Sequence, residues 1–267
     1  DIIAELGIHS FELILDVNGN LTEAREDNNN AIVDLSVVEP YEAQIDIPNQ
    51  IPRISPGSTE IVTVSLLATG SRTEDWTLSW DDSNLPSGWS IAPDGAQNNN
   101  PNLIPGIPQN FDFSTTVPES ALGDDNSFIV LTLSLDSDPS ISFESILPIE
   151  VLRTRGLSIV GPSGLDNTNG FGRPGHVATA WMMVENLGNA YETTTSIDWT
   201  APSWGGNPTL HESSGTEIFS LNLAPGEQKE LFVNLNTPSS IQFGSVTTTT
   251  MTMCIGSGDS TLCEDLS

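Results

Sequence analysis

The strongest constraint on the fold is an internal repeat built from proline-glycine pairs and alternating apolar strands. The first copy, residues 54–80, reads ISPGSTEIVTVSLLATGSRTEDWTLSW, and the second, residues 172–199, reads GRPGHVATAWMMVENLGNAYETTTSIDW. Each copy has a Pro-Gly pair, an alternating strand, a turn and a second strand that ends in tryptophan. Because such a repeat marks one structural unit used twice, the sequence predicts two modules of the same fold.

A second pair of matching segments continues the repeat. The segment that begins NLIPGIPQNFDF at Asn102 matches the segment that begins NLAPGEQKELFV at Asn222. In each copy the glycine of this Pro-Gly lies 12 residues before a later proline, and a further glycine, Gly123 or Gly244, follows. Matching positions that stay in register over this length favour duplication over chance.

The strands of each copy alternate with a period of two residues. Val62, Val64 and Leu66 alternate with polar residues, and no segment has the periodicity of a helix. The 18 prolines and 22 glycines divide the chain into short strands. About seven strands in roughly 100 residues are typical of an immunoglobulin-like sandwich. The sequence therefore predicts an all-β fold with tandem immunoglobulin-like antiparallel β-sandwiches.

Several motifs of the first copy occur in a known family. They are the Pro-Gly pairs, the sequence Leu-Pro-Ser-Gly-Trp at residues 85–89 and a late Val-Pro. Through them residues 46–152, and more loosely residues 156–267, resemble the alpha-galactosidase-type, NPCBM-associated immunoglobulin-like module. The second copy departs from the motif, because Ala-Pro-Ser-Trp at residues 201–204 replaces Leu-Pro-Ser-Gly-Trp.

The opening segment, residues 7–38, has a strand, an aspartate, a turn, Glu-x-x-Glu and Asn-Asn. In this order the features are similar to the final hairpin of CARDB modules, the cell-adhesion-related domains of bacteria and archaea. The two resemblances imply a large, modular, exported prokaryotic protein, such as a spacer, an adhesin or an appendage of a secreted hydrolase. They imply no catalytic residues.

The repeat and the resemblances together predict three modules. Residues 1–45 form a partial β module, residues 46–155 the first sandwich and residues 156–267 the second. The Arg-Thr-Arg-Gly sequence at residues 153–156 is typical of a short linker. The chain looks cut at both ends, because the second copy stops before the counterpart of residues 142–152 is complete. Truncation of a longer protein explains this, and strand donation between copies is the alternative.

The charge of the chain excludes several classes of partner. It has 36 acidic and 7 basic residues and a formal net charge of −29. Such a chain is repelled by nucleic acids and by anionic membrane surfaces. No apolar run is long enough to span a membrane. Salt at 1 M shortens the range of charge repulsion to about 3 Å, so the composition suits the exterior of a cell in a saline environment.

The two cysteines, Cys254 and Cys263, flank the sequence Gly-Ser-Gly-Asp, which is typical of a hairpin turn. Facing strands of such a hairpin would place the two sulfur atoms within bonding range. We therefore expect a disulfide and an oxidising compartment, with two buried thiols as the alternative. Asn20 begins an Asn-Leu-Thr sequon and is a candidate for glycosylation.

The sequence offers little for catalysis. Of the three histidines, His9 belongs to a different predicted module from His176 and His211, which lie 35 residues apart in sequence. The sequence Gly-Pro-Ser-Gly at residues 161–164 is not the Gly-x-Ser-x-Gly motif of a nucleophile. Acidic pairs would occur by chance among so many carboxylates. We therefore expect no enzymatic activity and no cofactor other than, as an alternative, Ca²⁺.

Acidic clusters in loops would suit calcium, which prefers oxygen ligands. One segment begins like an EF-hand loop, but its glycine, Gly19, stands at the fourth position rather than the sixth. The alternative interpretation is that these side chains accept hydrogen bonds from nearby backbone N–H groups in turns. The candidate ligands are Asp16, Asn18, Asp81, Asp82, Asp124, Asp125 and Asn126.

Three side chains are candidates for contact with a partner. The repeat alignment places Trp181 and Met183 on the face opposite to Met182, and a slip of one residue would bury both instead. Trp204 lies in a predicted loop. Exposed aromatic side chains often mark contacts with a protein or a glycan, although separate tryptophans do not make a sugar-binding platform.

These observations predict a non-enzymatic extracellular or cell-surface protein with a structural or adhesive role, acting as a spacer or an appendage. One alternative is a filament (pilus-like) subunit that assembles by β-strand donation. Another is an accessory region of a secreted hydrolase or a carbohydrate-binding module. The expected partners are neighbouring immunoglobulin-like modules, copies of the chain, or cell-surface proteins or glycans.

Overall fold

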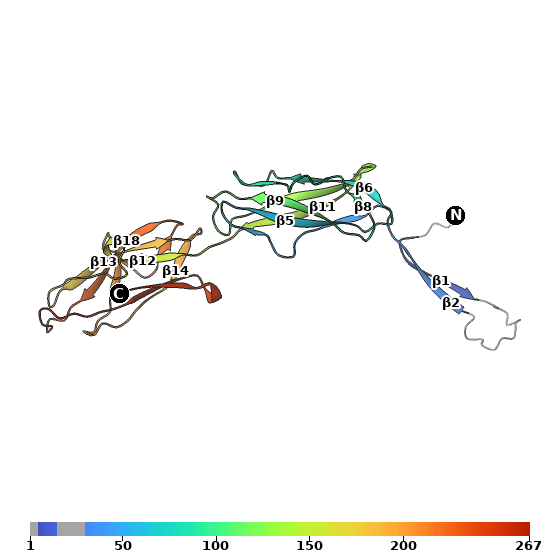
Figure 1. The fold of residues 1–267 in the computed structure, drawn as a ribbon. Helices are drawn as coiled ribbons and strands as arrows, with labels where there is room; N and C mark the ends of the chain where they lie inside the picture. The colour runs from blue at the N-terminus through green and yellow to red at the C-terminus, as the bar shows by residue number, and fades with distance from the viewer. Residues whose placement is uncertain (1–4, 15–29) are drawn as a thin grey trace. The chain divides into compact units, whose positions relative to one another are not determined.

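The structure, a computed structural model, describes residues 5–14 and 30–267. Its described elements are β-strands and two short 3₁₀ turns, Pro162–Gly164 and Gly258–Ser260. Apart from an N-terminal hairpin, the strands form predominantly antiparallel sheets that build two sandwiches, which confirms the predicted all-β fold (Figure 1). The predicted module boundaries at residues 45 and 155 stay a prediction.

By its internal contacts the chain divides into two compact units. Unit 1 contains Asp1–Pro52, Thr59–Thr116 and Ser127–Ile149, and unit 2 contains Arg53–Ser58, Val117–Asn126 and Glu150–Ser267. Unit 2 therefore includes two segments that precede the linker in sequence, in addition to the whole second sandwich.

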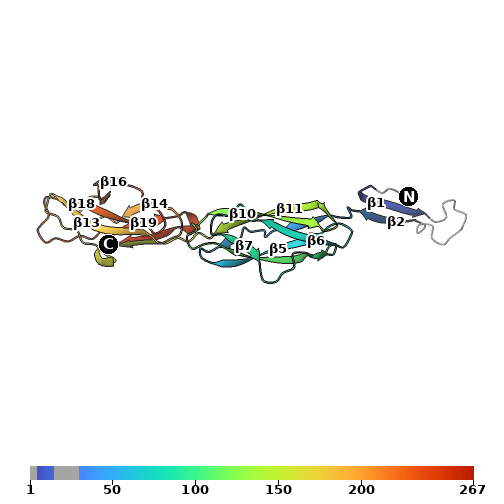
Figure 2. The same cartoon turned by 90° about the horizontal axis from the view of Figure 1, so that it is seen from above.

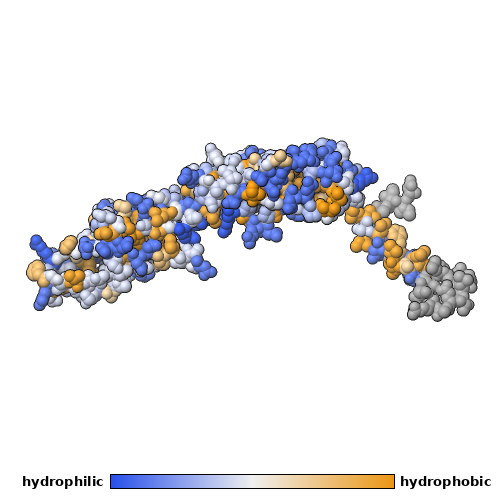
Figure 3. All heavy atoms as spheres, viewed as in Figure 1, coloured by the Kyte–Doolittle hydropathy of each residue, from blue (hydrophilic) through white to orange (hydrophobic). Residues whose placement is uncertain are grey.

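Strands β1 (Gly7–Ile14) and β2 (Asn30–Val37) form a two-stranded antiparallel hairpin. Phe11 pairs with Val33 and Leu13 with Ala31, so one face of the hairpin is largely apolar. Phe11 is 54% exposed and Val33 62%, and the hairpin accordingly shows much apolar surface in Figure 3. An isolated two-stranded hairpin has little stability in water. The candidate residues Asp16, Asn18 and Asn20 lie outside the described residues.

The first sandwich consists of a four-stranded and a five-stranded sheet. The four-stranded sheet has the order β3 (Ala43–Asp46), β5 (Thr59–Ala68), β9 (Gln109–Thr116), β7 (Ser90–Pro93). The five-stranded sheet has the order β4 (Arg53–Ile54), β11 (Asp138–Val151), β10 (Asn126–Leu135), β6 (Glu74–Asp81), β8 (Asn102–Leu103). All pairings described in these sheets are antiparallel except that of β4 with β11.

The core of the first sandwich follows the alternation of its strands. Val62, Val64 and Leu66 of β5 are buried, as the sequence predicts. Trp80 packs edge-on against Phe113, with their ring centroids 5.5 Å apart. Full burial of one such large apolar side chain contributes about 1.5–3 kcal/mol, so the repeated alternation accounts for the sandwich.

The second sandwich has the same architecture (Figure 2). Its five-stranded sheet has the order β12 (Leu157–Val160), β13 (Val177–Asn186), β18 (Gln228–Asn236), β15 (Thr209–Glu212), β16 (Glu217–Ile218). Its four-stranded sheet has the order β17 (Asn222–Leu223), β14 (Glu192–Trp199), β19 (Met251–Ile255), β20 (Leu262–Leu266). The core between the sheets includes Met182, Val184, Leu231 and Met253.

Besides β4 and β16, which have no counterpart strand in the other sandwich, the two sandwiches differ in the lengths of one pair of strands. In the first, β10 has 10 residues and β11 has 14. Their counterparts in the second, β19 and β20, have 5 residues each. Residues 245–250, which precede β19, have no assigned strand structure.

We expect that replacing Ser140 with alanine raises the pKa of Asp138 toward its ordinary value. Ser140 Oγ donates to Asp138 Oδ1 at 2.6 Å, and the Ser140 N–H donates to the same oxygen at 3.2 Å. The side-chain bond is the larger of the two causes that lower the pKa of Asp138. NMR titration of the carboxyl carbons in the wild type and in S140A measures the change.

The sign of the associated pH dependence follows from the lowered pKa. A carboxyl whose folded pKa lies below its unfolded value stabilises the fold above the unfolded pKa, and this contribution is lost as the pH falls through the folded pKa. Asp81 is an internal control, because its pKa is lowered by hydrogen bonds from the backbone and side chain of Ser83. An unchanged Asp138 pKa in S140A would contradict the assignment.

Candidate functional site

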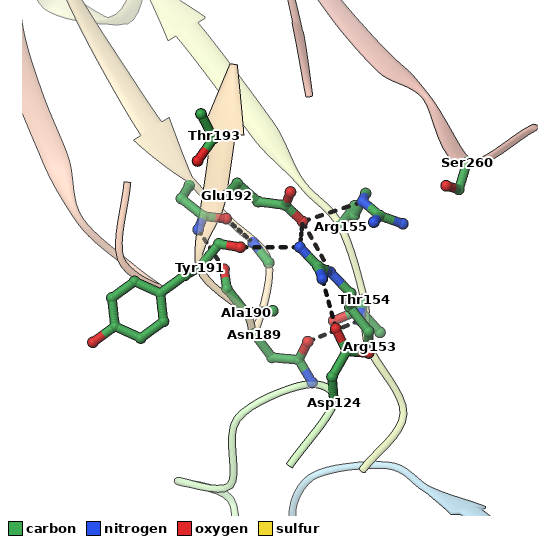
Figure 4. A network of polar contacts seen from close by, with 12 residues as sticks. Asp124, Arg153, Thr154, Arg155, Asn189, Ala190, Tyr191, Glu192, Thr193 and Ser260 are labelled. Carbon is green, nitrogen blue, oxygen red and sulfur yellow. Dashed lines mark hydrogen bonds and ion pairs between the residues drawn. The ribbon is translucent and has the colours of Figure 1, made fainter. Parts of the chain in front are cut away.

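The most connected polar site of unit 2 is an arginine network around Glu192, the first residue of β14. The Glu192 side chain is only 3% exposed. Its Oε1 lies 2.9 Å from Arg153 Nη2 and 3.2 Å from Arg155 Nε (Figure 4). The Arg155 contact is an ion pair without hydrogen-bond geometry. A buried carboxylate is tolerated only with such partners, so both arginines of the linker sequence compensate the charge of one acid.

Arg153 joins this site to a second acid and to the backbone. Its Nη1 donates to Asp124 Oδ2 at 2.6 Å, and its Nη2 donates to the Tyr191 carbonyl oxygen at 2.9 Å. Burial by itself lowers the pKa of Arg153, but the hydrogen bonds and charges of Glu192 and Asp124 outweigh it and raise that pKa above its ordinary value. The planar guanidinium thus satisfies several acceptors at once.

Asn189 holds the same stretch of backbone through its amide. The Thr154 N–H donates to Asn189 Oδ1 at 2.8 Å, and Asn189 Nδ2 donates to the Leu152 carbonyl oxygen at 2.8 Å. The Leu187 N–H donates to the Gly156 carbonyl oxygen at 2.9 Å. Residues 152–156 are therefore bonded along their length to the loop between β13 and β14.

Two glycines permit this close packing. A Cβ atom on Gly123 would lie 2.5 Å from Asn189 Oδ1 and 2.9 Å from the Cα of Arg153. A Cβ atom on Gly188 would lie 2.5 Å from the Thr154 carbonyl oxygen. Because real Cβ atoms do not approach other atoms so closely, any side chain at these positions would force the backbones apart. Gly123, an anchor of the repeat in sequence, thus has a packing role.

The loop that carries Asn189 is itself ordered by a fully buried asparagine, Asn186. Its Nδ2 donates to the carbonyl oxygens of Ala190 at 2.8 Å and Leu223 at 3.2 Å, and its Oδ1 accepts the Gly188 N–H at 2.9 Å. A buried amide with its hydrogen bonds made fixes the path of the chain around it. This places Asn189 and Glu192 against the linker.

In chemical terms the network consists of ionised groups that satisfy each other. Glu192 and Asp124 face guanidinium groups, and the remaining bonds go to amides of the backbone. Such an arrangement positions chain segments rather than a reacting molecule. In residues 5–14 and 30–267, no group of three or more His, Cys, Asp and Glu side chains is placed to hold a metal ion.

In the structure, most of the described candidate calcium ligands make hydrogen bonds or ion pairs with other groups of the chain. Asp81 accepts the Ser83 N–H at 2.9 Å and Asp125 accepts the Leu122 N–H at 3.0 Å, which are turn contacts. Asp124 is bound to Arg153, and Asn126 Nδ2 donates to the Asp124 carbonyl oxygen at 3.4 Å. Asp82 is exposed. Calcium binding stays a prediction.

The predicted partner-contact residues are half-buried. Met182 points into the core, and Trp181 and Met183 lie on the other face of β13. Trp181 Nε1 donates to Glu230 on the neighbouring strand β18. Trp204 lines a hollow of the second sandwich, and Glu192 is not among the residues that line it. The role of these residues in contact with a partner stays a prediction.

The disulfide between Cys254 and Cys263 is present. The two residues are directly opposite each other on β19 and β20, with their Cα atoms 4.1 Å apart. This confirms the pairing expected from the hairpin sequence.

Sequence reasoning identified the linker arginines but missed Glu192 and Asn189. One signal was present, since Glu192 and Thr194 alternate on the inward face of β14, and both are buried, as is Ala190 just before the strand. An acid at an inward position needs cations, and few positions of this chain supply them.

Comparison with known proteins gives distant structural likenesses alone. No protein-family model matches the sequence, and no curated protein matches it. Three solved structures illustrate the likeness. The extracellular cadherin domains 1–4 of protocadherin gamma B7 align at 14% identity over 88% of this chain and 51% of that one, with a TM-score of 0.35.

The secreted serine protease VesC from Vibrio cholerae aligns at 9% identity over 83% of this chain and 50% of that one, with a TM-score of 0.31. Domains 4 and 5 of the S-layer protein SbsC align at 13% identity over 85% and 97%, with a TM-score of 0.23. The chain thus spans about half of the protease and of the protocadherin. Likeness at this level does not bear on function. The resemblance to NPCBM-associated and CARDB modules stays a prediction.

Within residues 5–14 and 30–267, no helix is long and apolar enough to cross a membrane.

Proposed function

We propose that the chain is a non-enzymatic, extracellular structural or adhesive protein whose immunoglobulin-like sandwiches act as a spacer or a surface appendage. The observation that carries the proposal is the arginine network. It fastens residues 152–156 by ion pairs and backbone hydrogen bonds, where a flexible tether would leave them free. A spacer needs connecting segments that resist extension, since a slack connection would absorb the applied load.

Three further observations support the proposal. The disulfide between Cys254 and Cys263 fits an oxidising exterior. The most connected polar groups of unit 2 are committed to each other, as in structural networks, so they leave no free acid–base pair at that site. The large negative charge keeps a chain of this kind soluble outside the cell.

Single-molecule force spectroscopy on the full chain, held at both ends, tests the proposed function. We expect the two sandwiches to unfold as separate force peaks, with no early extension attributable to residues 152–156. Reduction should lengthen one unfolding step by roughly 30 Å, because the cysteines are 9 residues apart and an extended residue spans at most about 3.3–3.6 Å.

The double variant Cys254→Ser, Cys263→Ser is the control, since its steps should not respond to reductant. If the sandwiches extended at forces no higher than those that stretch an unfolded chain, a load-bearing spacer role would be wrong.

A further inference from the structure

The outer face of the five-stranded sheet of the second sandwich carries a row of aromatic side chains. Trp181 of β13 pairs with Phe232 of β18, and Phe232 pairs with His211 of β15. Directly paired residues of antiparallel strands point to the same face of a sheet, and Met182, which points the other way from Trp181, is buried in the core. The three rings therefore lie on the outside of the sandwich, where each is half-buried. We call them the aromatic row.

Hydrogen bonds hold the two outer rings of the aromatic row. Trp181 Nε1 donates to Glu230. His211 Nδ1 donates to the Gly215 carbonyl oxygen at 3.1 Å, and His211 Nε2 lies 2.9 Å from Thr209 Oγ1. Because rings that are already fixed lose little conformational freedom when a partner binds, the row is preorganised for contact.

The first sandwich shows that the fold does not need the aromatic row. The repeat aligns Thr63 with Trp181, and it aligns Asp112 with Phe232. Thr63 and Asp112 pair across the two corresponding strands, and Thr63 Oγ1 donates to Asp112 Oδ1 at 2.5 Å. The same architecture thus forms with a polar pair at these positions, so the stability of the sandwich does not account for the aromatic side chains.

The exposure of this face does not depend on the last strand, β20. That strand belongs to the opposite sheet, on the other side of the core. In the first sandwich the corresponding face is also uncovered, since Thr63 and Asn110 are exposed although residues 153–267 follow them in sequence. The face is therefore an outer surface of this type of sandwich and is open to a partner.

The charged residues on this face of the sheet are acidic. Glu185 and Glu230 alternate with core residues as Trp181 and Phe232 do, and Glu217 of β16 pairs with His211. Among the described strands of this sheet, no outward residue is a lysine or an arginine. Such a face attracts a cation, and a second copy of the chain, with a net charge of −29, is repelled by it.

Aromatic rings beside a carboxylate are suited to bind a guanidinium group. The positive charge is attracted to the face of an aromatic ring. The planar arginine side chain can stack on a ring and donate to a carboxylate at the same time, whereas lysine carries a compact, strongly hydrated charge. The Glu230 carboxylate accepts from Trp181 Nε1 through Oε1, and its second oxygen can accept from such a donor.

We propose that the aromatic row, with Glu230 beside it, binds an arginine side chain of a partner polypeptide. The proposal rests on the adhesive part of the proposed function, because it names the chemistry of a partner. Force spectroscopy tests the spacer, and a binding experiment tests this face, so the failure of one is distinguishable from the failure of the other.

The probe is the peptide Gly-Arg-Gly-Arg-Gly, acetylated and amidated at its ends. It is added to the full chain in about 0.5 M NaCl, which screens the general attraction between a basic peptide and an acidic chain. NMR follows the indole N–H resonance of Trp181, which the spectrum of Trp181→Thr identifies, and we expect this resonance to shift. A matched peptide with citrulline, an uncharged analogue of arginine, at both positions should bind at least about fivefold more weakly.

Two variants locate the site, with binding measured from the amide shifts of β15 and β18. Trp181→Thr introduces the residue that the first sandwich has at the aligned position, and Glu230→Gln removes a charge but keeps an oxygen for the Trp181 N–H. Each should weaken binding of the arginine peptide at least about threefold. Glu60→Gln, which removes an exposed acid of unit 1, is the control and should not weaken it. Thermal unfolding shows whether Trp181→Thr folds, and Glu230→Gln provides the test if it does not.

Three results would overturn the proposal. The first is an unchanged Trp181 resonance at the highest soluble concentration of the arginine peptide, and if cellohexaose shifted it instead, the face would bind a glycan. The second is equal binding of the citrulline peptide. The third is a loss of binding in Glu60→Gln as large as that in Glu230→Gln, because the peptide would then respond to the total charge of the chain.

Discussion

Replacing Glu192 with glutamine is expected to lower the free energy of unfolding of unit 2 by about 2–3 kcal/mol. The substitution keeps the size of the side chain but removes a buried charge that faces two arginines. Removal of one partner from a fully buried pair costs about 3–5 kcal/mol. The effect here should be smaller, because the arginine side chains are 25% exposed and retain contact with water.

Urea denaturation followed by tryptophan fluorescence measures the change in stability, and hydrogen exchange at residues 153–156 measures the local loosening. Glu227→Gln is the matched control. Glu227 is 37% exposed and lies 3.6 Å from Lys229, so a change of less than about 1 kcal/mol is expected there. Equal effects of the two substitutions would contradict the central role given to Glu192.

Removal of the disulfide is expected to have an effect of similar size. The bond closes a loop with a sequence separation of 9, and restriction of the unfolded chain by a loop of that length contributes about 2–3 kcal/mol. The double variant Cys254→Ser, Cys263→Ser should therefore unfold at a lower urea concentration than the oxidised wild type.

Reduced wild type is the control for the serine substitutions, because it breaks the same bond without a change of residue. The loss should be confined to unit 2, which carries both cysteines. A transition of unit 1 that moves by the same amount would contradict this confinement, because it would show that the two units do not unfold independently.

The fold could be predicted from the sequence because its determinants are local. Alternation along β5 and β10 decides which side chains face the core, and Pro-Gly pairs mark where strands begin. The burial of Val62, Val64 and Leu66 follows from that pattern. The disulfide was predictable for the same reason, since its cysteines are joined by one short turn.

The arginine network was only half predictable. Arg153 and Arg155 are conspicuous in a chain with 7 basic residues, but Glu192 lies 39 residues away from Arg153. Only the fold brings the two together, and nothing in the linker sequence selects this acid among 36.

The arginine network also affects how readily trypsin-like proteases can cleave the chain. Trypsin-like proteases cut after lysine or arginine, and they need that side chain free to enter a specificity pocket and the surrounding backbone free to become extended. Arg153 would have to leave Glu192, Asp124 and the Tyr191 carbonyl oxygen first. Arg155 would have to leave Glu192. Residues 153–156, which contain two potential cleavage sites, are therefore protected from trypsin-like proteases for as long as unit 2 stays folded.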